Sequence, residues 1–253
     1  MRDIVGLIPA AGIAQRLGEL SQSKEILPVV FGSERAGVDA FAKPACHHLL
    51  EGFISAGVTK AIMVLRTGKW DIPASLAQNP VPGVDLSYIV IAESAGVPWT
   101  LDRAYAFVRE LDVVMGYPDI LIRPTTFYRQ MVDELRTGKS DVVLGVMPTS
   151  NPSKVDVVEF TDDGKVDCIR PKPDGLTTAR AWIAAAWRPS FTEYLHEFLV
   201  DRPVGVVAER ELQIGDIIGA SLTELDVCAV VCDEGQFIDI GTPEDFADVR
   251  ADR

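Results

Sequence analysis

Short apolar segments alternate with segments of helical periodicity through the first half of the chain, and this alternation constrains the fold more than any other feature. The apolar segments are continuous rather than alternating, which is typical of strands covered by helices on both faces. We expect strands at residues 4–9, 61–65, 86–92, 112–116 and 141–146, and helices at 44–56, 99–109 and 125–135. The pattern predicts an α/β fold with a doubly wound, mostly parallel, Rossmann-like sheet.

The second half of the chain has a different pattern of apolar and polar residues. Its pattern predicts a hairpin around Asp162-Asp163-Gly164, with further strands and helices at 181–187, 191–200, 211–222, 227–231, 237–240 and 243–249. Neither repeats nor a linker separate the halves. We therefore expect residues 1–253 to form a single domain, with a small sub-domain built on the same sheet by residues 151–253.

The charge balance restricts the partners. The formal net charge is −13 and the sequence pI about 4.7, so the chain as a whole repels a phosphate backbone, and we expect no nucleic-acid partner. A small phosphorylated substrate would need a local basic cluster or a metal ion. No apolar run approaches the roughly 18 residues of a membrane span, and the first residues lack a signal-peptide pattern, so we expect a cytoplasmic protein without membrane contact.

The loop after the first expected strand carries the strongest chemical signal. Ala10, Ala11 and Gly12 have small side chains, which would allow backbone N–H groups to approach phosphate oxygens. Arg16 and Lys24 bring two cations toward the same loop. The segment is not a dinucleotide fingerprint, because Ala10 stands at the first glycine position, and it lacks the Gly-Lys-Ser/Thr end of a P-loop. Packing of small residues alone is the other interpretation.

Three motifs together resemble the sugar nucleotidylyltransferases, or NDP-sugar pyrophosphorylases, of the glucose-1-phosphate thymidylyltransferase type. The resemblance spans nearly the whole chain, and the motifs follow the family's order. They are the loop with Arg16-Leu17, Ser23-Lys24 and Leu27-Pro28, then Lys43-Pro44 with Ala56-Gly57 around a helix, and finally Asp239-Ile240-Gly241-Thr242-Pro243.

The resemblance implies a GT-A-like nucleotidyltransferase fold and an enzyme of nucleotide-sugar biosynthesis. Such an enzyme joins a nucleoside triphosphate, here dTTP or UTP by preference, to a sugar 1-phosphate and releases pyrophosphate. Residues 1–150 would mainly bind the nucleotide, and residues 151–253 the sugar phosphate and the metal. The family also allows a homo-oligomer.

The resemblance further implies that Asp119 and Asp239 bind Mg²⁺. In the family the first aspartate follows glycine directly, whereas two residues separate Gly116 from Asp119 here, and a Pro-Asp turn is the other interpretation. Mg²⁺ would neutralise charge at the α-phosphorus. The attacking phosphate oxygen is already anionic, so the reaction needs charge stabilisation, which we assign to Arg16 and Lys24 as catalytic residues, rather than a general base.

Two further segments are aligned with substrate contacts. Lys172 stands at the lysine of the family's Glu-Lys-Pro segment, with Pro171 in place of the glutamate, and together with Arg170 it would bind the sugar phosphate. Gly96 lies in the loop that reads the base, and joins Ala10, Ala11 and Gly12 as a nucleotide contact. A solvated basic turn and ordinary loop geometry are the respective alternatives.

Three other functions stay open at this point. The segment Pro9-Ala10-Ala11-Gly12 also resembles cytidylyltransferases that act on polyol phosphates. A non-catalytic nucleotide-binding protein of the same fold would explain the altered segment before Asp119. A dinucleotide-dependent oxidoreductase is disfavoured by the absent glycine fingerprint.

Overall fold

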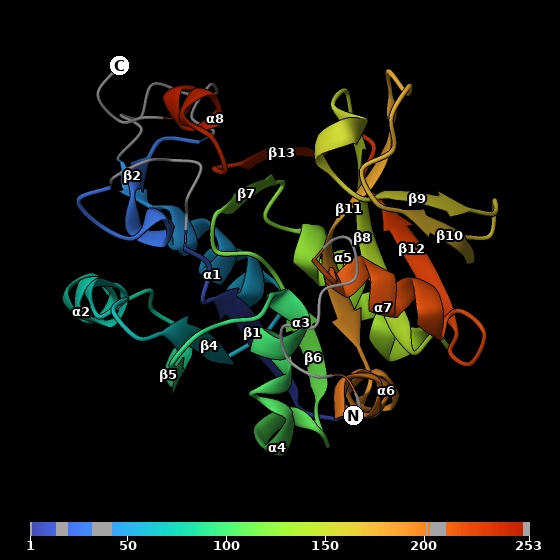
Figure 1. The fold of residues 1–253 in the computed structure, drawn as a ribbon, viewed down its shortest axis with the longest axis horizontal. Coiled ribbons are helices and arrows are strands. Elements are labelled where there is room, and N and C mark those ends of the chain that lie inside the picture. The colour runs from blue at the N-terminus through green and yellow to red at the C-terminus, as the bar shows by residue number, and fades with distance from the viewer. Residues whose placement is uncertain (1, 14–19, 32–41, 201, 203–210, 250–253) are drawn as a thin grey trace.

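A large mixed sheet forms the middle layer of the molecule (Figure 1). The computed structural model describes residues 2–13, 20–31, 42–200, 202 and 211–249. Within these residues, nine strands join in the order β10-β9-β11-β6-β1-β4-β5, with β8 between β11 and β12. The strands are β1 (Ile4–Ala10), β4 (Lys60–Arg66), β5 (Asp85–Ile91), β6 (Asp112–Met115), β8 (Val142–Thr149), β9 (Val157–Phe160), β10 (Val166–Arg170), β11 (Ala179–Trp187) and β12 (Val227–Val231).

The strand directions divide the sheet. Strands β6, β1, β4 and β5 run parallel to one another, and β12 runs parallel to β8. Strand β11 runs antiparallel between β6 and β8, and the β9–β10 hairpin continues this antiparallel part. Strands from both halves of the chain therefore belong to one sheet.

Helices cover both faces of this sheet. Ile8 and Ala10 of β1 face a core shared with α1 (Ala45–Ser55), α2 (Asp71–Gln78) and α5 (Phe127–Thr137). Val5 and Leu7 face the other core, which holds α3 (Val97–Asp102), α4 (Tyr105–Val108), α6 (Pro189–Val200) and α7 (Ile214–Ser221). This arrangement confirms the expected doubly wound α/β fold. No helix in the described part of the chain is long and apolar enough to cross a membrane.

Several local expectations need correction. The helix expected at residues 99–109 is interrupted, because the Ala104 N–H bonds the Leu101 carbonyl three residues back at 3.0 Å, and α3 and α4 result. Helix α2 and strand β7 (Ile120–Arg123) were not expected. A short ribbon of β2 (Pro28–Val29) and β3 (Lys43–Pro44) precedes α1.

A second, two-stranded sheet brings the end of the chain back to its beginning. Strand β13 (Gln236–Asp239) pairs antiparallel with β7, and the pair stands apart from the main sheet in Figure 1. Helix α8 (Pro243–Ala247) follows, with the Thr242 side chain capping its first turn at the Asp245 N–H. The Val249 carbonyl then accepts the Val30 N–H at 2.8 Å, which fixes the C-terminal segment beside β2.

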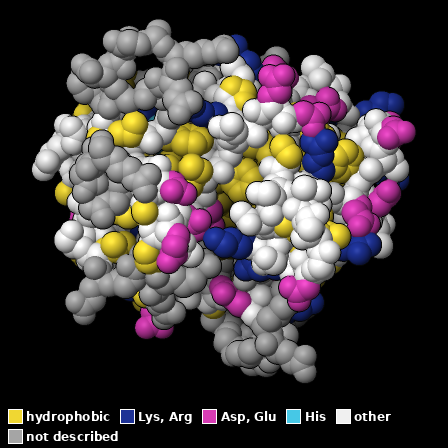
Figure 2. Space-filling view, turned by 90° about the horizontal axis from the view of Figure 1, so that it is seen from above, with side chains coloured by type: hydrophobic (Ala, Val, Ile, Leu, Met, Phe, Trp, Pro, Cys, Tyr) yellow, Lys and Arg dark blue, Asp and Glu magenta, His cyan; other side chains and the backbone are white. Residues whose placement is uncertain are grey.

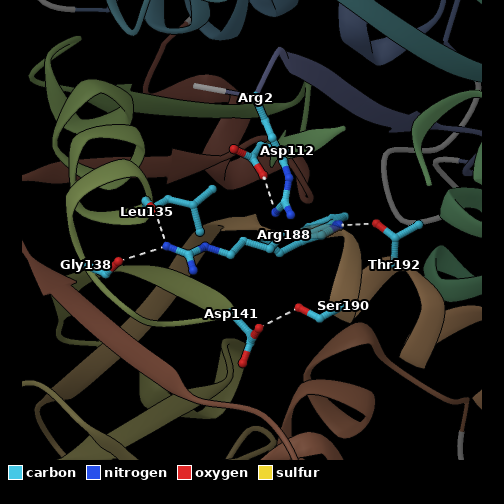
Figure 3. A network of polar contacts seen from close by, with 9 residues as sticks. Arg2, Asp112, Leu135, Gly138, Asp141, Arg188, Ser190 and Thr192 are labelled. Atoms are coloured by element: carbon cyan, nitrogen blue, oxygen red, sulfur yellow. Dashed lines mark hydrogen bonds and ion pairs between the residues drawn. The ribbon is translucent and has the colours of Figure 1, made fainter. Parts of the chain in front are cut away.

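The amino edge of the sheet is held by a polar network (Figure 3). The Arg188 guanidinium follows β11 and donates to the carbonyls of Leu135 and Gly138, both at 2.8 Å. The Ser190 hydroxyl donates to Asp141 at 2.6 Å. Since Trp187 lies opposite Val113 at the start of β6, this network is at the edge opposite the carboxyl ends of the parallel strands.

Candidate active site

Loops gather at the carboxyl edge of the parallel strands, where open α/β sheets bind ligands. Leu7 of β1 pairs with Met115 of β6, so the loops that follow these two strands are neighbours. Figure 2 looks onto the top of Figure 1 and shows a hollow with apolar side chains at its floor, with acidic and basic side chains beside it.

A small apolar core brings three sequence-predicted regions together at this edge. Leu27, Leu121 and Ile240 are buried in it, and they follow Lys24, Asp119 and Asp239 by one to three residues. Lys24 lies on a 3-10 turn (Lys24–Ile26), Asp119 precedes β7, and Asp239 ends β13. The hydrophobic contact of three short segments therefore positions three charged side chains.

The positioned charges interact directly. The Lys24 ammonium forms an ion pair with Asp119, and both side chains are largely buried, at 16% and 12% exposed. The Ile240 N–H donates to the Asp119 carbonyl at 2.9 Å, which joins the aspartate to the end of β13. The described residues thus surround Lys24 with acidic groups.

Electrostatics keeps Lys24 charged. Burial lowers the pKa of its ammonium, but the attraction of Asp119, Glu25 and Asp239 outweighs burial, and the net pKa is raised above the ordinary value of 10.5. Tyr117 is nearby: burial, together with Asp156, Asp119 and Asp239, raises the pKa of its hydroxyl. Its hydroxyl therefore keeps its proton at neutral pH.

The two aspartates suit a magnesium ion. Mg²⁺ is a hard cation that binds one or two carboxylates together with water and substrate phosphates, rather than a dedicated cage of protein ligands. The described residues contain no group of three or more histidines, cysteines or acids that could hold a metal. Asp119 and Asp239 lie on adjoining segments, and their role as ligands of a metal shared with a substrate stays a prediction.

The loop after β1 has two kinds of residue. Ala10 and Ala11 are buried and pack into the core. Gly12 is exposed, and a Cβ atom there would meet nothing within 4 Å. Arg16 lies outside the described residues.

The backbone conformation at Gly96 favours glycine. Its φ of 129° lies in the region that side chains disfavour, and a Cβ atom would lie 3.0 Å from Glu211 Oε1. The Gly96 N–H bonds Ser94 Oγ at 3.1 Å, and Ser94 in turn contacts the Thr100 hydroxyl at 2.6 Å. The loop is therefore ordered against the second half of the chain, and a contact with the base stays a prediction.

The two remaining basic residues lie on the antiparallel side of the sheet. Arg170 ends β10 and pairs with Glu159 of β9 at 2.9 Å, with its side chain 57% exposed. Lys172 is exposed and has a φ of 39°. The registers of β9, β11 and β6 place the end of β10 toward the same edge as the end of β6. Their role in binding a sugar phosphate stays a prediction.

Two residues of this edge escaped the sequence analysis. Lys69 and Asp71 follow β4 and hold the residues on either side of Lys24. The available signal was the turn Gly68-Lys69-Trp70-Asp71 directly after an expected strand, since such turns lie at the ligand-binding edge.

The fold and the charged cluster define an α/β protein that gathers a lysine and two aspartates at the carboxyl edge of its sheet, an arrangement suited to phosphate chemistry. Residues 5–253 match the model of the nucleotidyl transferase family, and the chain belongs to that family. The resemblance drawn from the motifs is thereby confirmed.

Two curated relatives match at 24% identity. One is the low-salt glycan biosynthesis nucleotidyltransferase Agl11 of Haloferax volcanii, aligned over 97% of this chain and 64% of the relative. The other is a glucose-1-phosphate thymidylyltransferase of Streptomyces antibioticus, aligned over 88% of this chain and 61% of the relative. The chain thus spans somewhat less than two thirds of the length of either.

Solved structures agree on the fold. A Bacillus anthracis protein assigned as a glucose-1-phosphate thymidylyltransferase superimposes with a TM-score of 0.80 at 20% identity, covering 97% of this chain and 93% of the other. A UTP-bound UGPase from Acinetobacter baumannii gives 0.77 at 16% identity, covering 98% and 92%. An inositol-1-phosphate CTP transferase from T. maritima gives 0.72 at 14% identity, covering 95% and 90%. The GT-A-like fold of nucleotidyltransferases is confirmed.

Proposed function

We propose that this chain transfers a nucleotidyl group from a nucleoside triphosphate to a sugar 1-phosphate and releases pyrophosphate. The observation that carries the proposal is the ion pair between Lys24 and Asp119 beside Asp239, at the carboxyl edge of the sheet. The family membership supports the reaction type. The thymidylyltransferase from Streptomyces antibioticus and the motif resemblance favour dTTP or UTP as the donor.

The transfer reaction requires the protein mainly to align the two substrates and to stabilise negative charge. The attacking oxygen of a sugar 1-phosphate is anionic at neutral pH, so no residue has to remove a proton. Lys24 stabilises the negative charge that grows on the triphosphate during transfer, and we assign the same role to Arg16. Asp119 and Asp239 would hold a Mg²⁺ ion, which supplies charge neutralisation at the phosphates when bound.

We assign the two halves of the chain to the two substrates. Residues 1–150 supply Ala10, Ala11, Gly12 and Gly96 to the nucleotide, as parts of loops at the ends of β1 and β5. Residues 151–253 supply Arg170 and Lys172 to the sugar phosphate, from the end of β10. Asp239 belongs to the second half of the chain, but the pairing of β13 with β7 places it beside the first half. This pairing supports one domain with a shared site.

A substrate matrix tests the proposal. Pyrophosphate release is measured with Mg²⁺ for dTTP, UTP, CTP, GTP and ATP against a set of sugar 1-phosphates and a set of polyol phosphates. We expect release only when one triphosphate and one sugar 1-phosphate are both present. Release with CTP and a polyol phosphate instead would assign the chain to the rival cytidylyltransferase reaction, and nucleotide binding without any release would point to a non-catalytic protein.

A further inference from the structure

The residue before Lys24 is tied to the start of α2. The Ser23 N–H donates to Asp71 Oδ2 at 2.6 Å, and the Ser23 hydroxyl donates to Asp71 Oδ1 at 2.8 Å. One carboxylate thus holds both the backbone and the side chain of Ser23. The contact joins positions 48 residues apart in the sequence, so local geometry does not produce it.

The residue after Lys24 is tied to the same short segment. Lys69 Nζ donates to Glu25 Oε1 at 2.5 Å, and the Lys69 and Glu25 side chains are only 7% and 2% exposed. Glu25 Oε2 is buried without a hydrogen-bond partner in the described structure. A buried ion pair is often no more stable than an apolar pair of the same volume, because desolvation offsets the attraction. What this pair adds to the loop is a fixed geometry.

The sheet explains how residues 69–71 reach this loop. Strands β4 and β1 are parallel neighbours, with Ala10 opposite Leu65, so the connections that follow them lie at the same edge. Lys24 therefore lies between two anchored residues, while its own ammonium extends to Asp119.

We propose that Lys69 and Asp71 are positioning residues of the transfer reaction, which hold the residues on both sides of Lys24 and so direct its ammonium toward the phosphates. The inference rests on the proposed function, because it gives Lys24 a catalytic role. A merely structural role for these residues would lower stability and leave turnover per folded molecule unchanged.

Steady-state kinetics of Lys69→Met and Asp71→Ala test the idea. Displacing a reacting group by about 1 Å costs on the order of 100-fold, so we expect kcat to fall by roughly 10- to 100-fold, with KM for the triphosphate changing far less. Lys69→Arg keeps the charge and is expected to restore most of kcat. If Lys69→Met fails to fold, Glu25→Gln with Lys69→Met removes both charges at similar volume, and the same loss of kcat is expected.

Arg188→Met provides the matched control. This substitution removes the two hydrogen bonds from the Arg188 guanidinium to the Leu135 and Gly138 carbonyls, at the opposite edge of the sheet (Figure 3). We expect it to lower Tm while kcat stays at the wild-type value. Equal kcat in wild type, Lys69→Met and the double variant would overturn the inference.

A second readout does not depend on turnover. Acetylation of Lys24 by acetic anhydride in the native protein is followed by peptide mass spectrometry. We expect it to be at least about threefold faster in Lys69→Met and Asp71→Ala, because the loop then opens more often. If the wild type releases no pyrophosphate, the proposed function is overturned. Faster labelling of Lys24 in the variants would in that case still support its positioning by Lys69 and Asp71. Lower kcat with unchanged labelling would show that these residues do not act through Lys24.

Discussion

Lys24 is the residue on which the account depends, and its surroundings determine its charge. Three carboxylates, from Asp119, Glu25 and Asp239, outweigh the cost of burial and raise the pKa of its ammonium. Sequence alone suggested a group of cations at a phosphate site. Among the described residues, the structure places one of these cations, Lys24, in a buried position between acidic groups.

The raised pKa of Lys24 has a defined consequence for pH dependence. A base whose folded pKa exceeds its ordinary 10.5 contributes stability that is complete below 10.5 and is lost as pH rises through the folded value. The stability difference between wild type and Lys24→Met should therefore be constant between about pH 6 and 9, and change in the mutant's favour only above about pH 10.5. Urea unfolding across this range measures it. A difference that already declines near neutral pH would contradict the environment described for Lys24.

Asp239 tests the metal assignment. Asp239→Asn removes one of the two carboxylates that we propose as metal ligands, and the number of charged ligands sets the affinity of a site for hard cations. We expect the Mg²⁺ concentration for half-maximal rate to rise by about tenfold or more. Asp245→Asn, a nearby exchange on α8 outside the cluster, should leave the Mg²⁺ requirement unchanged. An unaltered Mg²⁺ dependence in Asp239→Asn would exclude this residue as a ligand.

At the level of elements, the site depends on how closely β6 approaches two helices. Gly116 follows β6 at the point where the chain turns toward Asp119. A Cβ atom there would lie 2.4 Å from Leu49 Cδ1 and 2.5 Å from Tyr128 Oη, on α1 and α5. The two residues inserted before Asp119 therefore follow a glycine that packing requires, and Asp119 still reaches Lys24.

Gly116→Ala should consequently be costly. Forcing an extra methyl group into a packed region costs about 1–3 kcal/mol, and we expect a loss of that size in the free energy of unfolding. Gly12→Ala adds its methyl group to open space, so its effect on stability should stay below about 0.5 kcal/mol. Chemical denaturation of both variants compares them directly. Equal stabilities would show that the end of β6 can relax.

At the scale of the whole molecule, strands from both halves share one sheet, and β13 returns to β7 across the site. This connectivity predicts that the two halves unfold together. Hydrogen exchange of peptides from β4 and β12 in rising urea should give one midpoint, since these strands are linked through β1, β6, β11 and β8. Two separate midpoints would instead favour two independently stable halves.

Much of this architecture follows from local sequence pattern. The continuous apolar runs at β1, β4 and β12 predicted buried strands, and the motifs around Lys24 and Asp239 predicted where the loops would meet. Their contact depends on a small core of Leu27, Leu121 and Ile240, which no single segment reveals.

The anchoring of the loop was beyond sequence analysis for a similar reason. Lys69 and Asp71 look like ordinary surface residues until β4 and β1 are known to be neighbours. Burial of Glu25 and its pairing with Lys69 arise from tertiary packing across 44 residues of sequence. Long-range contacts of this kind carry no periodic signal.

The rate of pyrophosphate release by wild type and Lys24→Met, with Mg²⁺, a nucleoside triphosphate and a sugar 1-phosphate, tests the central claim most directly. We predict release by the wild type that needs both substrates and the metal, and a rate lower by about two to three orders of magnitude in a folded Lys24→Met variant, because a preorganised charge stabiliser is lost. Equal rates in the two proteins, or no release by the wild type with any substrate pair, would contradict the account.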